Sequence, residues 1–415
     1  MTRNNLIVAL ILIIFFVISF LTNIIGPLVP DIIKSFDLSL TLVALLPFAF
    51  FIAYGVMSIP SGILVEHIGE KKVMMLAFLL AFFGAFLFSW KPSYGLYIVS
   101  LFCIGAGMAM LQVATHPLLR VAGGEEHFAF NSVLGQLFFG LASFLSPLLY
   151  SYLLAGDAQT ERIANIFGSL VPGELPWISL YWIFACVALL MVVVIAAIKF
   201  PRVDLKADEK VGAWETHVTL LKKPMVIFYF LAIFCYVGTE QGVANWISQF
   251  LETYHGVDPQ TLGARTVALF WGLMTAGAVL GLVFLKFVDS RKVLVGFSLA
   301  AIVSLLVALL GSKSMALISF PLVGFFASVM WSIIIALALN SVRNHHGSFS
   351  GILVTGIAGG AIIPLIVGWL GDNVGLRTGM FFLFITLAYI GCIGFWAKPI
   401  VNNKLLGQKE TIATQ

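Results

Sequence analysis

The chain has 415 residues, of which 60% are hydrophobic and only 10% are charged. Soluble domains usually carry about a quarter charged residues, so this composition excludes an ordinary soluble enzyme. The four cysteines all lie inside apolar runs without the close spacing of a metal site, and we expect no metal and no cofactor.

Twelve long apolar runs follow one another along the chain, separated by short polar connections. Each crossing of about 30 Å of hydrocarbon takes about 20 apolar residues, so twelve helices use most of the length. The first run follows a single basic residue, Arg3, and lacks a small-residue cleavage site, so we interpret it as a helix and not as a signal peptide. We place the helices at residues 6–28, 41–65, 72–90, 95–121, 128–154, 176–199, 225–250, 262–286, 293–311, 315–341, 349–370 and 377–397.

The charges predict the orientation. If the N-terminus is cytoplasmic, most of the 23 Lys and Arg residues fall on the cytoplasmic side, as the positive-inside rule requires. This distribution accounts for the net charge of +4 without a nucleic-acid partner. We therefore expect a multi-pass protein of a bacterial inner membrane, with both termini in the cytoplasm. We expect it to be a monomer whose surroundings are the lipid bilayer.

The chain divides into two six-helix halves. We assign residues 1–200 to an N-terminal bundle, 201–224 to a cytoplasmic linker, 225–400 to a C-terminal bundle and 401–415 to a cytoplasmic tail. The segment from Gly62 to Lys72 is echoed by Gly281 to Lys292, and the helix that begins at Phe130 and carries Pro147 is echoed by one that begins at Phe349 and carries Pro364. The fold class that we predict is an all-α membrane protein with twelve transmembrane helices in two pseudo-symmetric bundles, which resembles the major facilitator superfamily.

Three segments resemble the fucose/galactose/glucose:proton symporter family of that superfamily. They are Leu111 to Leu118 with the following helix that holds Gln136, Tyr236 to Glu240, and Gly359 to Pro364. The resemblance implies a sugar symporter that works by alternating access.

Some positions depart from the family pattern. Gly26 stands where the fucose permeases have an aspartate, and Gln112 stands where they have a glutamate. Many hexose members also carry glutamine at the second position, which favours an uncharged, hexose-like sugar. Ala278 and Ala327 replace an arginine and an asparagine that family members often carry. These losses leave the sugar and the coupling ion open.

Glu240 is the one acidic residue that we place within a helix interior. An ionised carboxylate in hydrocarbon costs several kcal/mol, so such a residue normally faces a cavity and has a function. We expect Glu240 to couple transport to a cation, with a proton favoured over sodium. A structural carboxyl that is hydrogen-bonded between helices is the alternative.

A sugar needs neutral amides for its hydroxyls and an apolar face for its ring. Gln241, Asn245 and Ser248 share one face at spacings of i, i+4 and i+7. The tryptophans are candidates for stacking on the ring, although membrane tryptophans also serve as interfacial anchors. The residues that we predict to bind the sugar are Asn23, Gln112, Gln136, Gln241, Asn245, Trp246 and Trp271.

A second group of charged residues lies in the cytoplasmic connections. Acidic and basic side chains there can form charge-assisted bonds that hold the cytoplasmic side closed. We interpret this group as a gate that does not touch the sugar. Its members are Glu66, Lys71, Lys72, Asp289 and Arg291.

Two other functions compete with a sugar symporter. An exporter of drugs or metabolites would have the same fold, and the many Phe side chains would suit apolar substrates, but the amides favour a hydroxylated one. A multi-pass membrane enzyme would need a metal-binding or nucleophilic group at an interface, and the sequence offers no catalytic residues of that kind. We therefore expect a transporter and not an enzyme.

Overall fold

A computed structural model describes residues 4–124, 128–154, 166–167, 170–200, 214–342 and 346–399. Within this part of the chain, twelve helices are long and apolar enough to cross a membrane. The described residues form helices and connections without a strand. The predicted all-α class and the number of spans are therefore confirmed.

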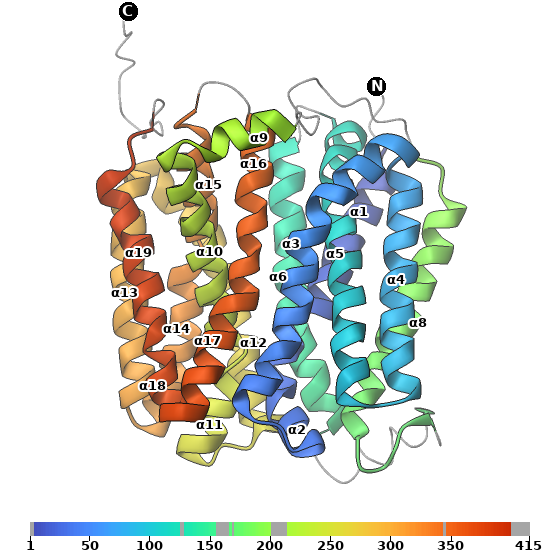
Figure 1. Ribbon diagram of the computed structural model, residues 1–415, viewed down its shortest axis with the longest axis vertical. Helices are drawn as coiled ribbons and strands as arrows, with labels where there is room; N and C mark the ends of the chain where they lie inside the picture. Colours follow the sequence, from blue (N-terminus) through green and yellow to red (C-terminus); the bar gives the residue numbers. More distant parts are fainter. Residues whose placement is uncertain are drawn as a thin grey trace, which may run out of the picture.

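The first half contains six spans. Its helices are α1 (Asn5–Thr22), α2 (Ile25–Phe36), α3 (Leu40–Ile68), α4 (Glu70–Trp90), α5 (Tyr94–Gly123), α6 (Phe128–Leu154), the 3₁₀ turn η3 (Pro176–Ile178) and α8 (Ser179–Ala197). Helix α9 (Trp214–Leu221) follows the first half in the chain and lies at one end of the molecule, against the second half (Figure 1).

The second half contains the other six spans. Its elements are α10 (Pro224–Ala244), α11 (Ile247–His255), the π-helical turn η4 (Pro259–Gly263), α12 (Ala264–Phe287), α13 (Ser290–Leu310), α14 (Lys313–Ala327), α15 (Met330–Leu339), α16 (His346–Thr355), the 3₁₀ turn η5 (Gly356–Ala358), α17 (Gly359–Val374), α18 (Leu376–Met380) and α19 (Phe382–Trp396).

Two pairs of long helices join the halves. Helix α3 packs along α17, and α6 packs along α12. Figure 1 shows the first-half helices on one side of the molecule and the second-half helices on the other. We call the end where α9 lies, with Lys71, Lys72 and Lys398, the basic end, and the other end, where α2, α11 and α18 lie, the opposite end.

Glycines allow close helix packing at matching places in the two halves. A Cβ atom on Gly105 of α5 would lie 2.2 Å from the carbonyl oxygen of Phe50 in α3. At the corresponding place in the second half, a Cβ atom on Gly324 of α14 would lie 2.4 Å from the carbonyl oxygen of Phe270 in α12. Side chains larger than hydrogen cannot fit there, so these small residues set the distance between the helix axes.

The first helix of each half is interrupted where we predicted a single helix. The helix predicted at 6–28 ends as α1 at Thr22 and resumes as α2, which extends to Phe36. The helix predicted at 225–250 ends as α10 at Ala244 and resumes as α11. Asn23 and Asn245 are the C-cap residues of α1 and α10, and we call these two interruptions the bends.

Two later helices are also divided. The helix predicted at 315–341 is interrupted between α14 and α15, and the one predicted at 349–370 contains the 3₁₀ turn η5 between α16 and α17. Each interruption lies inside a continuous apolar run, so hydrophobicity alone gave no signal for it.

Candidate substrate and coupling site

The two bends lie against each other. A Cβ atom on Gly26, at the start of α2, would lie 2.4 Å from the carbonyl oxygen of Ala244 and 3.3 Å from the Cα atom of Asn245. This contact explains the departure at Gly26, because the backbone of α10 occupies the space that an aspartate side chain would need. The bends therefore bring the first helices of the two halves together.

The bend of the first half carries a neutral polar cluster. Asn23 is buried, and its Nδ2 atom donates to Ser143 Oγ of α6 at 2.9 Å and to Ser19 Oγ at 3.3 Å. Ser19 and Ser143 are themselves hydrogen-bonded at 2.6 Å. The Oδ1 atom of Asn23 is buried without a hydrogen-bond partner among the described residues.

Gln136 lies on the same stripe of α6 as this cluster. It is seven residues before Ser143, so the two side chains leave the helix in nearly the same direction. Gly140, between them, faces α12, where a Cβ atom would lie 2.0 Å from Thr275 Oγ1. Gln136 itself is exposed. Its stripe therefore runs between α1 and α12, toward the second half.

Gln112 lies on α5 and is half-buried. Its Oε1 atom accepts a hydrogen bond from the hydroxyl of Tyr54 on α3. Phe51 lies one turn before Tyr54 on α3. A Cβ atom on Gly360 of α17 would contact both the ring of Phe51 and the side chain of Val237 of α10. Contacts through α3 and α17 thus link the neighbourhood of Gln112 to the helix that carries Glu240.

Glu240 lies in the last turn of α10, just before the second bend. Its carboxylate accepts a hydrogen bond from Gln241 Nε2 at 3.2 Å and another from the hydroxyl of Tyr236. The Tyr236 ring lies 5.9 Å from the Trp331 ring of α15. The carboxyl is therefore held by one phenol and one amide from its own helix.

The second bend and the neighbouring helix α12 hold several buried polar groups. Trp246 is buried, and its Nε1 atom donates to the carbonyl oxygen of Pro364 at 3.3 Å. Asn245 Nδ2, Ser248 Oγ and Trp271 Nε1 are buried without a hydrogen-bond partner among the described residues. Buried polar atoms are nearly always satisfied, so each such atom calls for an explanation.

Our statement that Glu240 alone lies within a helix interior is wrong. Asp31 lies inside α2, within the first membrane span, because that helix continues for eight residues beyond the predicted end at 28. Asp31 accepts from Tyr150 of α6 at 2.7 Å and from Gln260 of η4 at 3.3 Å. The apolar pair Ile32 and Ile33, directly after Asp31, was the sequence signal for the longer helix.

Further bonds join the halves at the opposite end. Asp372 of α17 accepts from the backbone amides of Leu40 and Thr41, each at 2.8 Å, at the start of α3. An anion at a helix N-terminus is favoured by the helix dipole. Lys34 of α2 forms an ion pair with Glu252 of α11. The opposite end is therefore closed by polar contacts between the two halves.

The residues that we predicted as a gate lie at the basic end. Lys71 donates to the carbonyl oxygens of Ala196 and Ile198, both at 2.8 Å, at the end of α8 in its own half. Arg291 pairs with Asp289 at 3.2 Å, and its hydrogen bonds hold the pKa of that carboxyl below its usual value. These bonds stay within one half. Glu66 lies in the last turn of α3 and Lys72 is exposed, and a role of the group in gating stays a prediction.

The sequence model of the Major Facilitator Superfamily matches residues 11–364. This chain belongs to that superfamily, as its twelve spans and the joined halves led us to expect. Superfamily members are transporters, which excludes the membrane enzyme as an alternative.

Individual relatives agree with this class. The chain is 31% identical to the glucose/galactose transporter of Brucella abortus over 92% of its own length and 91% of the relative's. It is 25% identical to the L-fucose-proton symporter of Escherichia coli over 88% and 87% of the two lengths. Its fold matches the crystal structure of the E. coli fucose:proton symporter with a TM-score of 0.66 and 23% identity, covering 94% of this chain and 98% of that one. The resemblance that the motifs indicated is confirmed.

Proposed function

We propose that this transporter imports a hexose-like sugar together with a cation, by alternating access. The relatives support the substrate class, because one is named a glucose/galactose transporter and another an L-fucose-proton symporter. Sugars of this kind present several hydroxyls, each of which can donate and accept a hydrogen bond. The site must therefore offer donors and acceptors that the protein itself leaves free.

The observation that carries this proposal is the set of free polar atoms at the two bends and in α12. Asn23 Oδ1 is an acceptor, while Asn245 Nδ2 and Trp271 Nε1 are donors, and none has a partner among the described residues. Three helices, α1, α10 and α12, supply them. A ring of hydroxyls satisfies acceptors and donors together, whereas an apolar drug would leave all three unpaired at a cost of about 1 to 3 kcal/mol each. This difference favours a sugar over the exporter alternative.

We assign the coupling of the cation to Glu240. A proton is favoured over sodium, because the recorded partners of this carboxyl are a phenol and an amide. Sodium, a hard cation, would call for several oxygen ligands. A single carboxyl can still load and release one proton.

The contacts at the opposite end form the closed gate in this proposal. Asp372, Asp31 and the Lys34–Glu252 pair each connect one half to the other, so all of them must separate before a sugar can enter from that end. The lysines of the basic end support a cytoplasmic position for that end, by the positive-inside rule. We propose a monomer in the bacterial inner membrane, with both termini cytoplasmic.

Uptake by the purified protein in liposomes tests the proposal. Radiolabelled glucose, galactose and fucose are offered under an imposed pH gradient without sodium, and separately under a sodium gradient at constant pH. We expect accumulation of a hexose under the pH gradient alone. Accumulation that requires sodium would show that sodium, and not the proton, is the coupling ion. The absence of uptake of all three sugars under both gradients would contradict the sugar assignment.

A further inference from the structure

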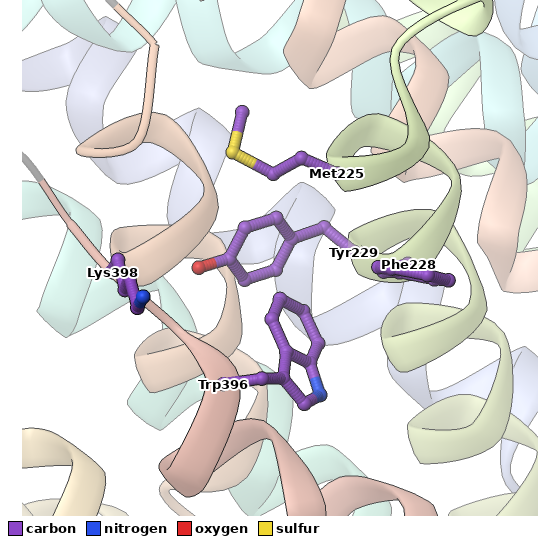
Figure 2. A pocket seen from close by; sticks show the side chains of 5 residues that line it. All are labelled: Met225, Phe228, Tyr229, Trp396 and Lys398. Carbon is purple, nitrogen blue, oxygen red and sulfur yellow. The ribbon is translucent and has the colours of Figure 1, made fainter.

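A cavity of about 310 Å³ lies at the basic end, between the start of α10 and the end of α19. Met225, Phe228, Tyr229, Trp396 and Lys398 line it (Figure 2). The ring of Trp396 lies 5.0 Å from the ring of Tyr229 and 5.7 Å from that of Phe228. The cavity is therefore a mostly apolar space with one ammonium group at its rim.

The surroundings of the cavity face the membrane. Ile227, Phe228 and Leu231 are exposed along one side of α10, and Phe395 of α19 is 78% exposed. Both helices are membrane spans, so exposed apolar side chains on them lie against lipid. Trp396 lies at the end of its span, where tryptophan commonly marks the boundary between hydrocarbon and headgroups. Lipid chains can thus reach the apolar wall.

The neighbourhood of the cavity is positively charged. Lys398, at the rim, follows the end of α19, and Lys222 and Lys223 directly precede α10, with all three side chains exposed. Helix α10 begins at Pro224 without a side chain that caps its first amides. An uncapped helix N-terminus favours an anion, and here it adds to the lysines at the same level of the membrane.

We propose that this cavity binds one anionic phospholipid of the leaflet at the basic end. Part of an acyl chain lies against Phe228 and Trp396, and the phosphate lies between Lys398 and the start of α10. Basic pockets between membrane helices bind anionic headgroups through this combination of an apolar wall and a charged rim. The site lies at the far end of α10 from Glu240 and is separate from the sugar site.

Photolabelling in vesicles tests the site directly. The full-length protein is reconstituted in phosphatidylcholine that contains a trace of phosphatidylglycerol with a photoreactive group on its acyl chain. After illumination, peptide mapping should find the label on the first turns of α10 and the last turn of α19. Unlabelled phosphatidylglycerol should reduce this labelling at least fivefold, while added phosphatidylcholine should not.

Two matched pairs of variants separate the wall from the rim. We expect Trp396→Ala to reduce the labelling at least fivefold and Phe395→Ala, an adjacent and more exposed residue outside the cavity, to leave it unchanged. We expect Lys398→Gln to reduce the competition by phosphatidylglycerol, and Lys286→Gln, an exposed lysine at the end of α12, to leave it unchanged.

Several results would overturn the proposal. They are labelling spread evenly over the lipid-facing helices, equal competition by phosphatidylcholine, and equal effects within either matched pair. Because Lys398 is exposed, its substitution leaves the fold intact, so the rim remains testable even if Trp396→Ala destabilises the protein.

Discussion

The two bends show how the repeated halves came to differ. In the first half, Asn23 is hydrogen-bonded to two serines, which are neutral partners. In the second half, Asn245 has a free Nδ2 atom and follows Glu240 and Gln241. Both halves thus use an asparagine at the end of their first helix, but only the second places a carboxyl beside it. The repeat provides the geometry of binding, and local sequence provides the asymmetry that coupling to an ion requires.

Each bend also separates two tasks along one span. The long segments, α1 and α10, carry the polar groups of the candidate sugar site, whereas the short segments beyond them, α2 and α11, meet each other and carry Lys34 and Glu252. A change at the bend can therefore alter the gate segments while the long segments stay packed in their own halves. This division is a natural basis for rocking of the halves about a central site.

Removal of the charge at the second bend tests the asymmetry most strongly. We expect Glu240→Gln to abolish accumulation driven by a pH gradient, because the amide cannot exchange the proton, while sugar exchange across the membrane persists through the amide's hydrogen bonds. Liposome uptake and counterflow assays measure the two activities. Glu174→Gln, an exposed carboxyl outside the spans, serves as the control and should accumulate sugar normally. A Glu240→Gln protein that still concentrates sugar would show that this carboxyl is structural and that the bends are functionally alike.

Loss of an amide should have the next largest effect. Gln112→Ala and Gln136→Ala should each weaken sugar binding by about 1 to 3 kcal/mol, or about 5-fold to 150-fold in Kd, because a sugar hydroxyl is left unpaired. Isothermal titration with the identified hexose measures this. Asn340→Ala removes an exposed amide at the C-cap of α15 and should bind normally. If both site variants bind as tightly as the parent, the first half contributes nothing to sugar recognition.

Hydrophobicity predicted the helices well, because each span needs about 20 apolar residues to cross the hydrocarbon of the membrane. The bends were not predictable from it, since it does not distinguish a broken helix from a continuous one. Pro27 is a separate signal for the first bend, because a proline cannot donate to the carbonyl of Asn23, four residues earlier, whereas the second bend at Asn245 has no such proline. Asp31 was missed for a related reason, because its helix continues past Pro30 into a polar segment. Glu240 was accessible from sequence, as an isolated carboxyl in hydrocarbon is costly enough to stand out. Its bond to Tyr236 depends on side-chain packing that no pattern specifies.

The contact between the bends can be broken by one methyl group. Gly26→Ala places a Cβ atom 2.4 Å from the carbonyl oxygen of Ala244, so α2 and α10 must move apart. Overpacking typically costs about 1 to 3 kcal/mol, but opening of the gate relieves part of this strain. We therefore expect a several-fold shift toward the state that is open at the opposite end. Labelling of a cysteine introduced at Thr41 reports that opening. Gly95→Ala, where nothing lies within 4 Å, should label as the parent does.

The smallest effect is expected at the ion pair between the short segments. Lys34 is 61% exposed at its side chain and Glu252 is 22% exposed, so water and salt screen much of their attraction. Exposed ion pairs contribute about 0 to 1 kcal/mol, which corresponds to less than about a fivefold change in the balance of open and closed states. We expect Lys34→Glu to increase labelling at position 41 within that limit, and the exchanged pair, Lys34→Glu with Glu252→Lys, to restore it. High salt should reduce the difference between the single variant and the parent, since it screens the charges in both. If Lys34→Glu opens the gate far more than fivefold, this ion pair is the main contact between the short segments. The hydrogen bonds of Asp31 and Asp372 would then contribute little to the stability of the closed state.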